Sequence, residues 1–274
     1  MSRLSLLFLS LAVGCGENRS PWTPYEPLSN TELCFSDSDA VLSREEFPFE
    51  LDLAVPFYEG RDRNIDYAGG VADDGRPIWD FRGNEAEDEV IDVTAHSLED
   101  SWYSGDFPTA QWYIEDENKN HSLYAMDASG IVILGLASED AQPSNGQKNL
   151  IVYDRPISIL PLPFGVGSTI EDEIQIENAT LNDFPLYGSH SYSTRVDDVG
   201  YLYLEDVGFT ESYRVHSSFS YQIDDAEPVT YRSTHFYVPC VGEVVRLDSY
   251  ENEDQFNFTD LSSIRRLKWN GLYP

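Results

Sequence analysis

An alternation of apolar and polar residues with a period of two constrains the fold of this chain more than any other feature, and it runs from Phe47 onward. It is clearest over residues 170–177 and 213–223. Because successive side chains of a strand point to opposite faces of a sheet, the alternation predicts half-buried antiparallel strands. The apolar positions are Ile170, Ile174, Ile176, Tyr213, Val215, Phe219, Tyr221 and Ile223, and the polar positions of the first stretch are Glu171, Glu173, Gln175 and Glu177.

Two other stretches, residues 130–137 and 150–153, are apolar on both faces, which predicts strands in the centre of a sheet. One helix is expected near the end, where Asp260 can cap a segment that ends near Gly271. We therefore predict a mostly-β fold, an antiparallel curved sheet in the form of a half-barrel or sandwich, with one short C-terminal helix. The helix would carry Leu261, Ile264 and Leu267 on one side, and turn signals lie at residues 73–75, 117–120, 144–146 and 197–200.

The first fourteen residues have the form of a secretory signal, with Arg3 before an apolar run from Leu4 to Val13 that is too short to span a bilayer. Its end, Gly14 followed by Cys15, resembles the lipobox of bacterial lipoproteins. That resemblance implies that Cys15 is acylated and that the protein is anchored to a membrane by lipid. Gly16 favours the outer membrane, with the domain facing the periplasm or the cell surface. An ordinary signal peptide with an incidental cysteine is the alternative.

The chain is expected to form one folded domain behind a tether. Residues 15–46 are rich in proline and small polar residues and lack periodicity, so we assign them to an extended, proline-rich tether. Residues 47–274 are assigned to a single antiparallel β domain. No repeat of solenoid or propeller period is evident.

Two cysteines remain once Cys15 is set aside as the lipidated residue. Cys34 and Cys240 form an even pair in a chain that is expected to reach an oxidising compartment, so we predict a disulfide between them. Such a bridge closes a loop of about 200 residues, for which chain-entropy arguments allow roughly 5 kcal/mol. Two buried free thiols are the alternative.

The charge is strongly acidic, with 49 Asp and Glu against 17 Lys and Arg and a net charge of −32. A field of this sign repels phosphate backbones, so nucleic-acid binding is not expected. The acidity fits either a surface that attracts calcium or adaptation to a salty habitat. Because 41% of the residues are hydrophobic, the chain can still bury a sizeable core.

No catalytic motif stands out, and no catalytic residue is assigned. The sequence lacks G-x-S-x-G, S-x-x-K, H-E-x-x-H, C-x-x-C and a phosphate-binding glycine loop. The five histidines are widely scattered, which favours structural roles over a zinc site. A pair of carboxylates of the kind that glycosidases use stays open, because the spacing it needs cannot be read from sequence.

Two acidic stretches have partial calcium-loop spacing, although no cofactor is required by the sequence. Each lacks the glycine at position 6 of an EF-hand loop, and the flanks of the first are strand-like, so a plain hairpin turn is the alternative. The first stretch supplies Asp116, Asn118, Asn120 and Asp127, and the second supplies Asp62, Asn64, Asp66 and Asp73.

Aromatic residues make up 13% of the chain and suggest a ligand surface. Trp79, Trp102 and Trp112 are candidates for a platform on which sugars stack. Cross-strand aromatic pairs within the core are the alternative.

Four segments resemble a set of uncharacterised secreted or lipid-anchored β-rich proteins from Bacteroidetes and deltaproteobacteria. They are GRPIWDF (75–81), ILPLPFGVGST (159–169), GYLYLEDVGFTESYRV (200–215) and FYVPCVGEVVRL (236–247). The resemblance implies an extracytoplasmic antiparallel β fold, and it carries no activity with it.

Taken together, these features predict a non-enzymatic, lipid-anchored envelope protein that binds a ligand or an envelope partner on a curved sheet. A secreted glycan hydrolase and a structural adhesion module are the alternatives.

Overall fold

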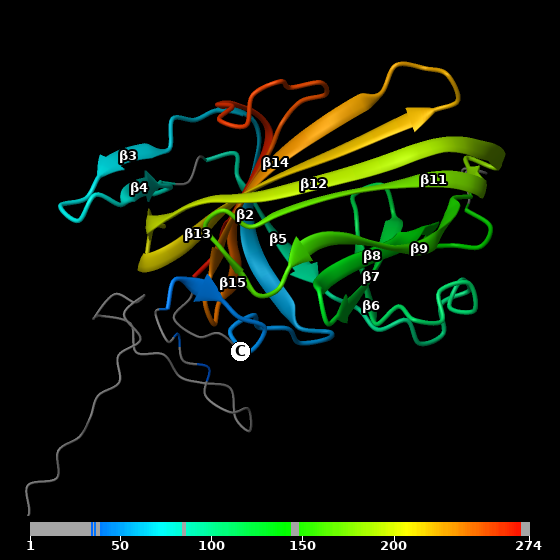
Figure 1. Cartoon of the computed structure of the whole chain (residues 1–274), viewed down its shortest axis with the longest axis horizontal. Helices are drawn as coiled ribbons and strands as arrows, with labels where there is room; N and C mark the ends of the chain where they lie inside the picture. Colours follow the sequence, from blue (N-terminus) through cyan, green and yellow to red (C-terminus); the bar gives the residue numbers. More distant parts are fainter. Residues whose placement is uncertain (1–33, 35, 37–38, 84–85, 144–147, 270–274) are drawn as a thin grey trace, which may run out of the picture.

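The computed structural model describes residues 34, 36, 39–83, 86–143 and 148–269, and strands are its only extended regular elements (Figure 1). None of the described residues belongs to a helix that would span a membrane. The strands are β1 (Val41–Leu42), β2 (Ala54–Asn64), β3 (Ala68–Val71), β4 (Pro77–Asp80), β5 (Glu89–Thr94), β6 (Trp112–Glu115), β7 (Asn120–Asp127) and β8 (Gly130–Ser138). They continue with β9 (Leu150–Pro161), β10 (Phe164–Gly165), β11 (Thr169–Leu181), β12 (Phe184–Tyr203), β13 (Gly208–Ile223), β14 (Val229–Val238), β15 (Gly242–Asp248) and β16 (Asp260–Leu267).

Twelve strands form one antiparallel, barrel-like sheet in the order β5-β2-β16-β15-β14-β13-β12-β11-β9-β8-β7-β6. The β3–β4 hairpin branches from this sheet, because β4 pairs in parallel with the end of β12. The short strands β1 and β10 pair separately. In Figure 1 the long strands β11 and β12 extend above β6 to β9, so that the two ends of the strand order turn back toward one another.

A single bridge joins the two edges of the sheet. His96, just after β5, and Tyr113, in β6, exchange two backbone hydrogen bonds of 2.9 and 3.0 Å. This bridge brings the two edge strands together at one point and so shortens the exposed edges that an open sheet would offer to other chains. The curved sheet predicted from the alternation is therefore confirmed, in a nearly closed form.

The predicted helix at the end of the chain is wrong, because residues 260–267 form β16. This segment lies between β15 and β2 and pairs with both. An isolated helix of this length is marginal in water, whereas two neighbouring strands supply ladder hydrogen bonds on both sides. Tertiary pairing therefore outweighs the local apolar spacing.

The turn predicted at residues 197–200 is also wrong, since these residues lie within the twenty-residue strand β12. The register of β12 against β13 shifts between Val196 and Asp198, which is a β-bulge. The predicted turns at 73–75 and 117–120 do connect strands, β3 to β4 and β6 to β7. The apolar stretch 130–137 lies in β8 between two neighbours, as expected for a central strand.

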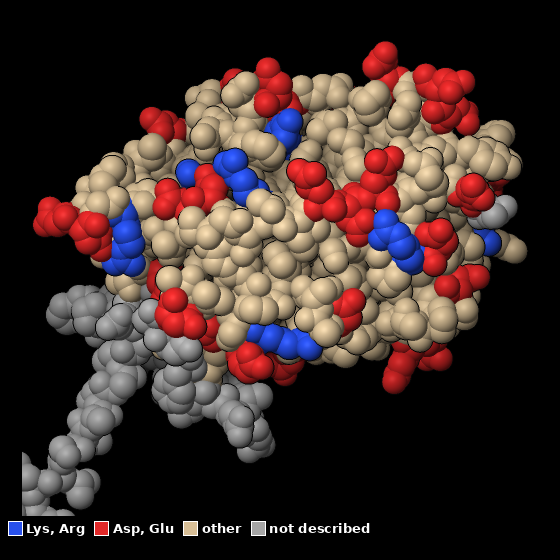
Figure 2. Space-filling model, viewed as in Figure 1, with Lys and Arg blue, Asp and Glu red and all other residues tan. Residues whose placement is uncertain are grey.

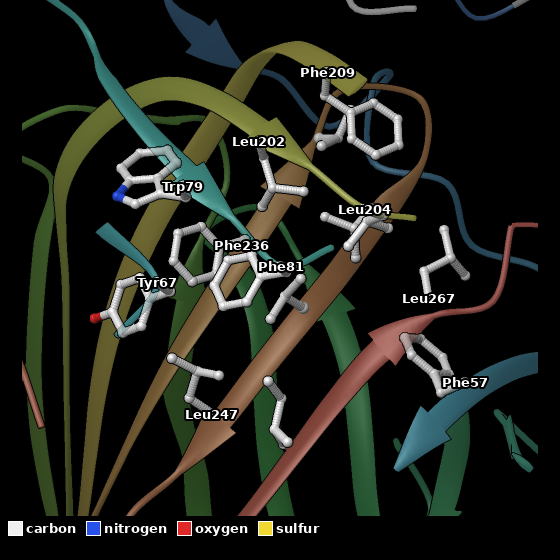
Figure 3. Close-up of a cluster of buried hydrophobic side chains, with 14 of the residues drawn as sticks. Phe57, Tyr67, Trp79, Phe81, Leu202, Leu204, Phe209, Phe236, Leu247 and Leu267 are labelled. Carbon is white, nitrogen blue, oxygen red and sulfur yellow. The ribbon is translucent and has the colours of Figure 1, made fainter. Parts of the chain in front are cut away.

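The two faces of the sheet make different contacts: the inner face packs against the opposite side of the sheet, and the outer face packs against the β3–β4 hairpin. The inner face is the side of the sheet that the curvature encloses, where side chains from distant strands pack together. Examples are Met126 of β7, Leu160 of β9 and Val215 of β13. The outer face of β13 to β16 carries a separate apolar cluster beneath the β3–β4 hairpin (Figure 3), which includes Phe236 and Leu247. Other members of this outer cluster are Trp79, Phe81, Leu202, Phe209, Val245 and Ile264.

The predicted disulfide is confirmed, with Cys34 bonded to Cys240 and Cα atoms 5.6 Å apart. It ties the start of the described chain to the turn between β14 and β15. Leu42 in β1 is fully buried in the cluster that closes one part of the interior. The packed structure thus includes residues at the end of the segment that the sequence assigned to the tether.

Gly135 is expected to be intolerant of a side chain. Its φ of +147° is unfavourable for other residues, and an added Cβ would lie 2.0 Å from the carbonyl oxygen of Ile151 and 2.8 Å from the ring of Phe107. We predict that Gly135→Ala lowers the free energy of unfolding by about 2–4 kcal/mol in chemical denaturation. The control is Gly105→Ala, where nothing lies within 4 Å of the added atom. Equal stability of the two variants would contradict this packing.

Candidate functional site

Polar and aromatic side chains gather on the inner face of β12 to β16, and strand register explains how they meet. Directly paired residues of neighbouring strands point to the same face of a sheet. One such row crosses from Val215 to His235, Arg246, Arg265 and Glu59. The adjacent row consists of Ser217, Ser233, Asp248, Ser263 and Arg61.

Glu243 is the acceptor at one end of this polar surface. Its Oε2 lies 2.6 Å from Nδ1 of His235 and accepts a longer, 3.4 Å hydrogen bond from the hydroxyl of Tyr237. Burial by itself would raise the pKa of Glu243, but the charge and hydrogen bond of His235, with the charges of Arg265 and Arg246, lower this pKa to about 2. Glu243 is therefore ionised at neutral pH.

Asp248 is the second acceptor, and its oxygens are fully engaged. Oδ1 accepts hydrogen bonds from Ser233 (2.6 Å) and from Nε of Arg246 (2.8 Å), while Oδ2 accepts one from Ser263 (2.9 Å). Although burial opposes ionisation, the charges of Arg246 and Arg265 hold the pKa of Asp248 far below its ordinary value. We call Glu243, Asp248, Arg246, Arg265 and His235 the ionic cluster.

The opposite wall of the sheet also faces the ionic cluster. Burial raises the pKa of Tyr124 of β7, and its ring stacks on Trp112 at 6.0 Å between centroids. Tyr124 also lies within electrostatic range of the cluster, because the charges of Arg246 and Arg265 act to lower its pKa and that of Glu243 acts to raise it. This proximity arises from the closure of the sheet, across which β7 lies five strands from β15. The cluster is thus enclosed between two walls.

Aromatic side chains continue the inner face beyond the ionic cluster, toward the far ends of β12 to β14. Tyr192 and Phe219 are paired residues whose ring centroids lie 4.8 Å apart, and Tyr221 stacks on Tyr231 at 6.4 Å. The hydroxyl of Tyr153 lies 2.7 Å from Nδ1 of His190. We call these residues the aromatic row, whose members are Tyr153, His190, Tyr192, Phe219, Tyr221 and Tyr231.

Solvent reaches this enclosed surface. On β15 the residues that face the outer cluster, such as Val245 and Leu247, are completely buried, whereas the inward Arg246 and Asp248 keep 36% and 24% of their side-chain surface. Apolar side chains such as Leu160 and Val215 fill another part of the interior. The surface around Arg246 and Asp248 is therefore the part of the inner face that stays in contact with solvent.

The three tryptophans singled out from the sequence do not form a common platform. Trp79 and Trp112 are 2% and 3% exposed, so neither offers a ring face to a ligand. Trp79 lies in the outer cluster, whereas Trp102 packs against the cluster around Tyr103. The indole N–H of Trp102 donates to the carbonyl of Ser138.

The first calcium-like stretch is divided by a strand. Asp116 closes the β6–β7 turn by accepting hydrogen bonds from the backbone N–H groups of Asn118 and Asn120, both 2.8 Å. Asp127 lies at the other end of β7, roughly 23 Å away at the usual rise of a strand. These four residues therefore cannot share one ion, and the hairpin turn is the better interpretation.

The second stretch is likewise engaged in local contacts. Asp62 accepts a hydrogen bond from the hydroxyl of Tyr250, Asn64 contacts Asp260, and Asp66 accepts one from the backbone of Ala68. Asp73 lies in the turn that links β3 to β4. In the part of the chain that the structure describes, no three acidic, histidine or cysteine residues form a metal-binding group. The signal segment and Cys15 lie outside the described residues.

A second polar network, on the outer face, has the form of a catalytic triad, but its histidine and hydroxyl group are closed off from solvent. His216 links Asp197 (3.1 Å) to the hydroxyl of Thr234 (2.9 Å), and Arg214 forms a bidentate pair with Asp197. Burial would raise the pKa of Asp197, but His216 and Arg214 lower it to about 2. Because Thr234 and His216 are 0% and 1% exposed, no substrate can reach them, and we assign this network to structure.

The ionic cluster and the aromatic row escaped the sequence analysis for a physical reason. A polar residue that alternates with apolar ones has the same pattern whether its face meets bulk water or an enclosed, wetted interior. The one usable signal was the density of charge in the strands themselves, in EVVRLD (243–248) and SSIRRL (262–267).

His190 is expected to make stability pH-dependent. Burial lowers the pKa of His190 to about 4, while the unfolded chain protonates it near 6.5. The unfolded state therefore binds more protons between these values, and the free energy of unfolding should fall by about 2–3 kcal/mol as the pH drops from 6.5 to 4. We predict that His190→Gln removes this loss in urea titrations at several pH values.

Tyr153→Phe is the matched control, since it removes the neighbouring hydroxyl but keeps the enclosure that shifts the pKa. This variant should retain the pH dependence. A His190→Gln variant that still loses the same stability would show that His190 is not the group responsible.

Comparison of the chain with protein-family models, with curated proteins and with solved structures finds no match in any of the three, so no activity or ligand can be carried over from a relative.

Proposed function

We propose that this protein is a lipid-anchored protein of the bacterial outer membrane, non-enzymatic in type, that binds a ligand on the inner face of its sheet. The signal-like first fourteen residues and Cys15 support the anchor and the location. The disulfide supports an oxidising compartment, where such bonds persist. The acidic charge, which is visible as scattered Asp and Glu on the face in Figure 2, argues against nucleic acid as a partner.

One observation carries the binding proposal. The ionic cluster and the aromatic row lie between the walls of the sheet and yet keep part of their surface exposed. Ligand sites in proteins combine this kind of enclosure with aromatic rings and a few fixed polar groups. A purely structural interior would be expected to be apolar throughout, as it is around Leu160 and Val215, since burying charged groups costs free energy.

Glycan hydrolysis by a carboxylate pair is less well supported. That chemistry needs one carboxyl group with a raised pKa to act as the general acid. Glu243 and Asp248, the two carboxylates of the ionic cluster, both have lowered pKa values and are held by arginine, histidine and serine side chains. Neither is suited to donate a proton near neutral pH.

The test is native mass spectrometry of the full chain carrying Cys15→Ser, secreted into a periplasm and incubated with an extract of bacterial envelope. We predict an added mass of lipid or sugar size. The added mass should diminish when the aromatic row is interrupted by Phe219→Ala.

Phe184→Ala is the control, because this residue is 74% exposed at the β11–β12 turn and lies away from the aromatic row. A bare protein mass after incubation would contradict ligand binding and favour an adhesion module. Equal loss of the added mass in both variants would show that the ligand does not lie on the inner face.

A further inference from the structure

Arg246 and Arg265 stand directly opposite one another on the inner face of β15 and β16. Like charges in directly paired positions of an antiparallel sheet destabilise it. Elsewhere on the chain, arginines are paired with the abundant carboxylates, as Arg155 is with Asp172 and Arg214 with Asp197. Two adjacent arginines on one enclosed surface therefore need a compensating interaction.

The protein supplies only part of that compensation. A guanidinium has five N–H donors, and Arg246 uses Nε for its hydrogen bond to Asp248. Arg265 comes no nearer to a carboxylate than 3.9 Å, from its NH2 to Oε1 of Glu243, which is too long for a hydrogen bond. Glu59, the residue paired with Arg265 on β2, is engaged instead by Arg61, whose NH2 donates to its Oε2 at 3.1 Å.

The neighbouring carboxylates are largely engaged. Asp248 already accepts from Ser233, Ser263 and Arg246, and Oε2 of Glu243 accepts from His235 and Tyr237, which leaves Oε1 of Glu243, 3.9 Å from Arg265, as the acceptor that remains. The surface therefore has a surplus of donors and a shortage of acceptors. A ligand that fits it must bring acceptor oxygens, and negative charge would also relieve the repulsion between the two arginines.

The surroundings suit an anionic group on a ring-bearing molecule. Tyr124 faces the arginines from the opposite wall, and the rings of His235 and Tyr237 stack at 5.9 Å beside them. The arginines keep 36% and 17% of their side-chain surface exposed, so solvent reaches part of each side chain. The acidic exterior repels anions at long range, so only such a local pair of cations can hold one.

We propose that Arg246 and Arg265 form an anion site that binds the carboxylate or phosphate group of the ligand. This inference rests on the proposed function and adds the chemical class of the ligand. A planar carboxylate or a phosphate can take parallel N–H donors from a guanidinium, which a neutral hydroxyl group cannot match in strength.

The test is isothermal titration calorimetry of the Cys15→Ser chain in 0.2 M NaCl with four probes: glucuronate, glucose 6-phosphate, glucose and inorganic phosphate. We expect a charged sugar to bind at least tenfold more tightly than glucose. Preference for glucuronate would identify a carboxylate ligand, and preference for glucose 6-phosphate, or binding of inorganic phosphate, would identify a phosphate ligand. Glucose binding as tightly as the charged sugars, or no binding of any anion, would overturn the proposal.

Variants connect the binding to the two arginines. Arg265→Gln should weaken anion binding at least tenfold, and Arg265→Lys, which keeps the charge but loses the planar fork, at least threefold. Arg82→Gln is the control, because Arg82 is 60% exposed and is paired with Asp80 outside the inner face. Circular dichroism verifies folding, and if Arg265→Gln does not fold, Arg265→Lys decides. Unchanged affinity in the arginine variants would overturn the proposal.

Failure of the anion site and failure of the proposed function give different results. A neutral mass that co-purifies in native mass spectrometry, with no anion binding in calorimetry, would overturn the anion site and leave ligand binding on the inner face intact. Absence of both would overturn both.

Discussion

The antiparallel hydrogen-bond ladder that runs through twelve strands and returns on itself at His96 and Tyr113 is the constraint on which the rest of the structure depends. Because the ladder curves until its edges meet, the sheet has an enclosed inner face and an outer face that needs separate cover. Strands β12 and β13, which share the longest pairing, extend far enough to carry both the inner rows of side chains and the outer cluster. The disulfide then fastens the start of the folded part to the turn after β14.

Apolar packing on the outer face explains how charged groups are tolerated on the inner face of β14 to β16. The outer cluster, with Phe236, Val245 and Leu247 completely buried, supplies apolar burial in addition to that of the interior around Leu160 and Val215. The segment around Tyr103 and Phe107 covers β7 and β8 in the same way. Because the outer cluster and the segment around Tyr103 and Phe107 stabilise the sheet, its inner face on β14 to β16 can hold charged groups.

Much of the strand structure could be predicted from sequence, because the period of two reports on local geometry. The alternation at 170–177 and 213–223 located β11 and β13, and the doubly apolar 130–137 located the central β8. Residues 260–267 and 197–200 were misassigned because a strand between two partners and a bulge both depend on distant neighbours. The site was missed for a related reason: alternation shows that two faces differ, and only the closure of the sheet shows that one of them is enclosed.

The most direct test of this account is the solvent accessibility of the inner face in the folded protein. Ser217 contacts His235 on the inner face, whereas Ser212, on the same strand, is fully buried. A cysteine in place of Ser217 should react with a small, polar thiol reagent at native pH without unfolding, and a cysteine in place of Ser212 should not. If the cysteine at 217 is as unreactive as the one at 212 until the protein is unfolded, the inner face is a sealed core and cannot be the binding surface.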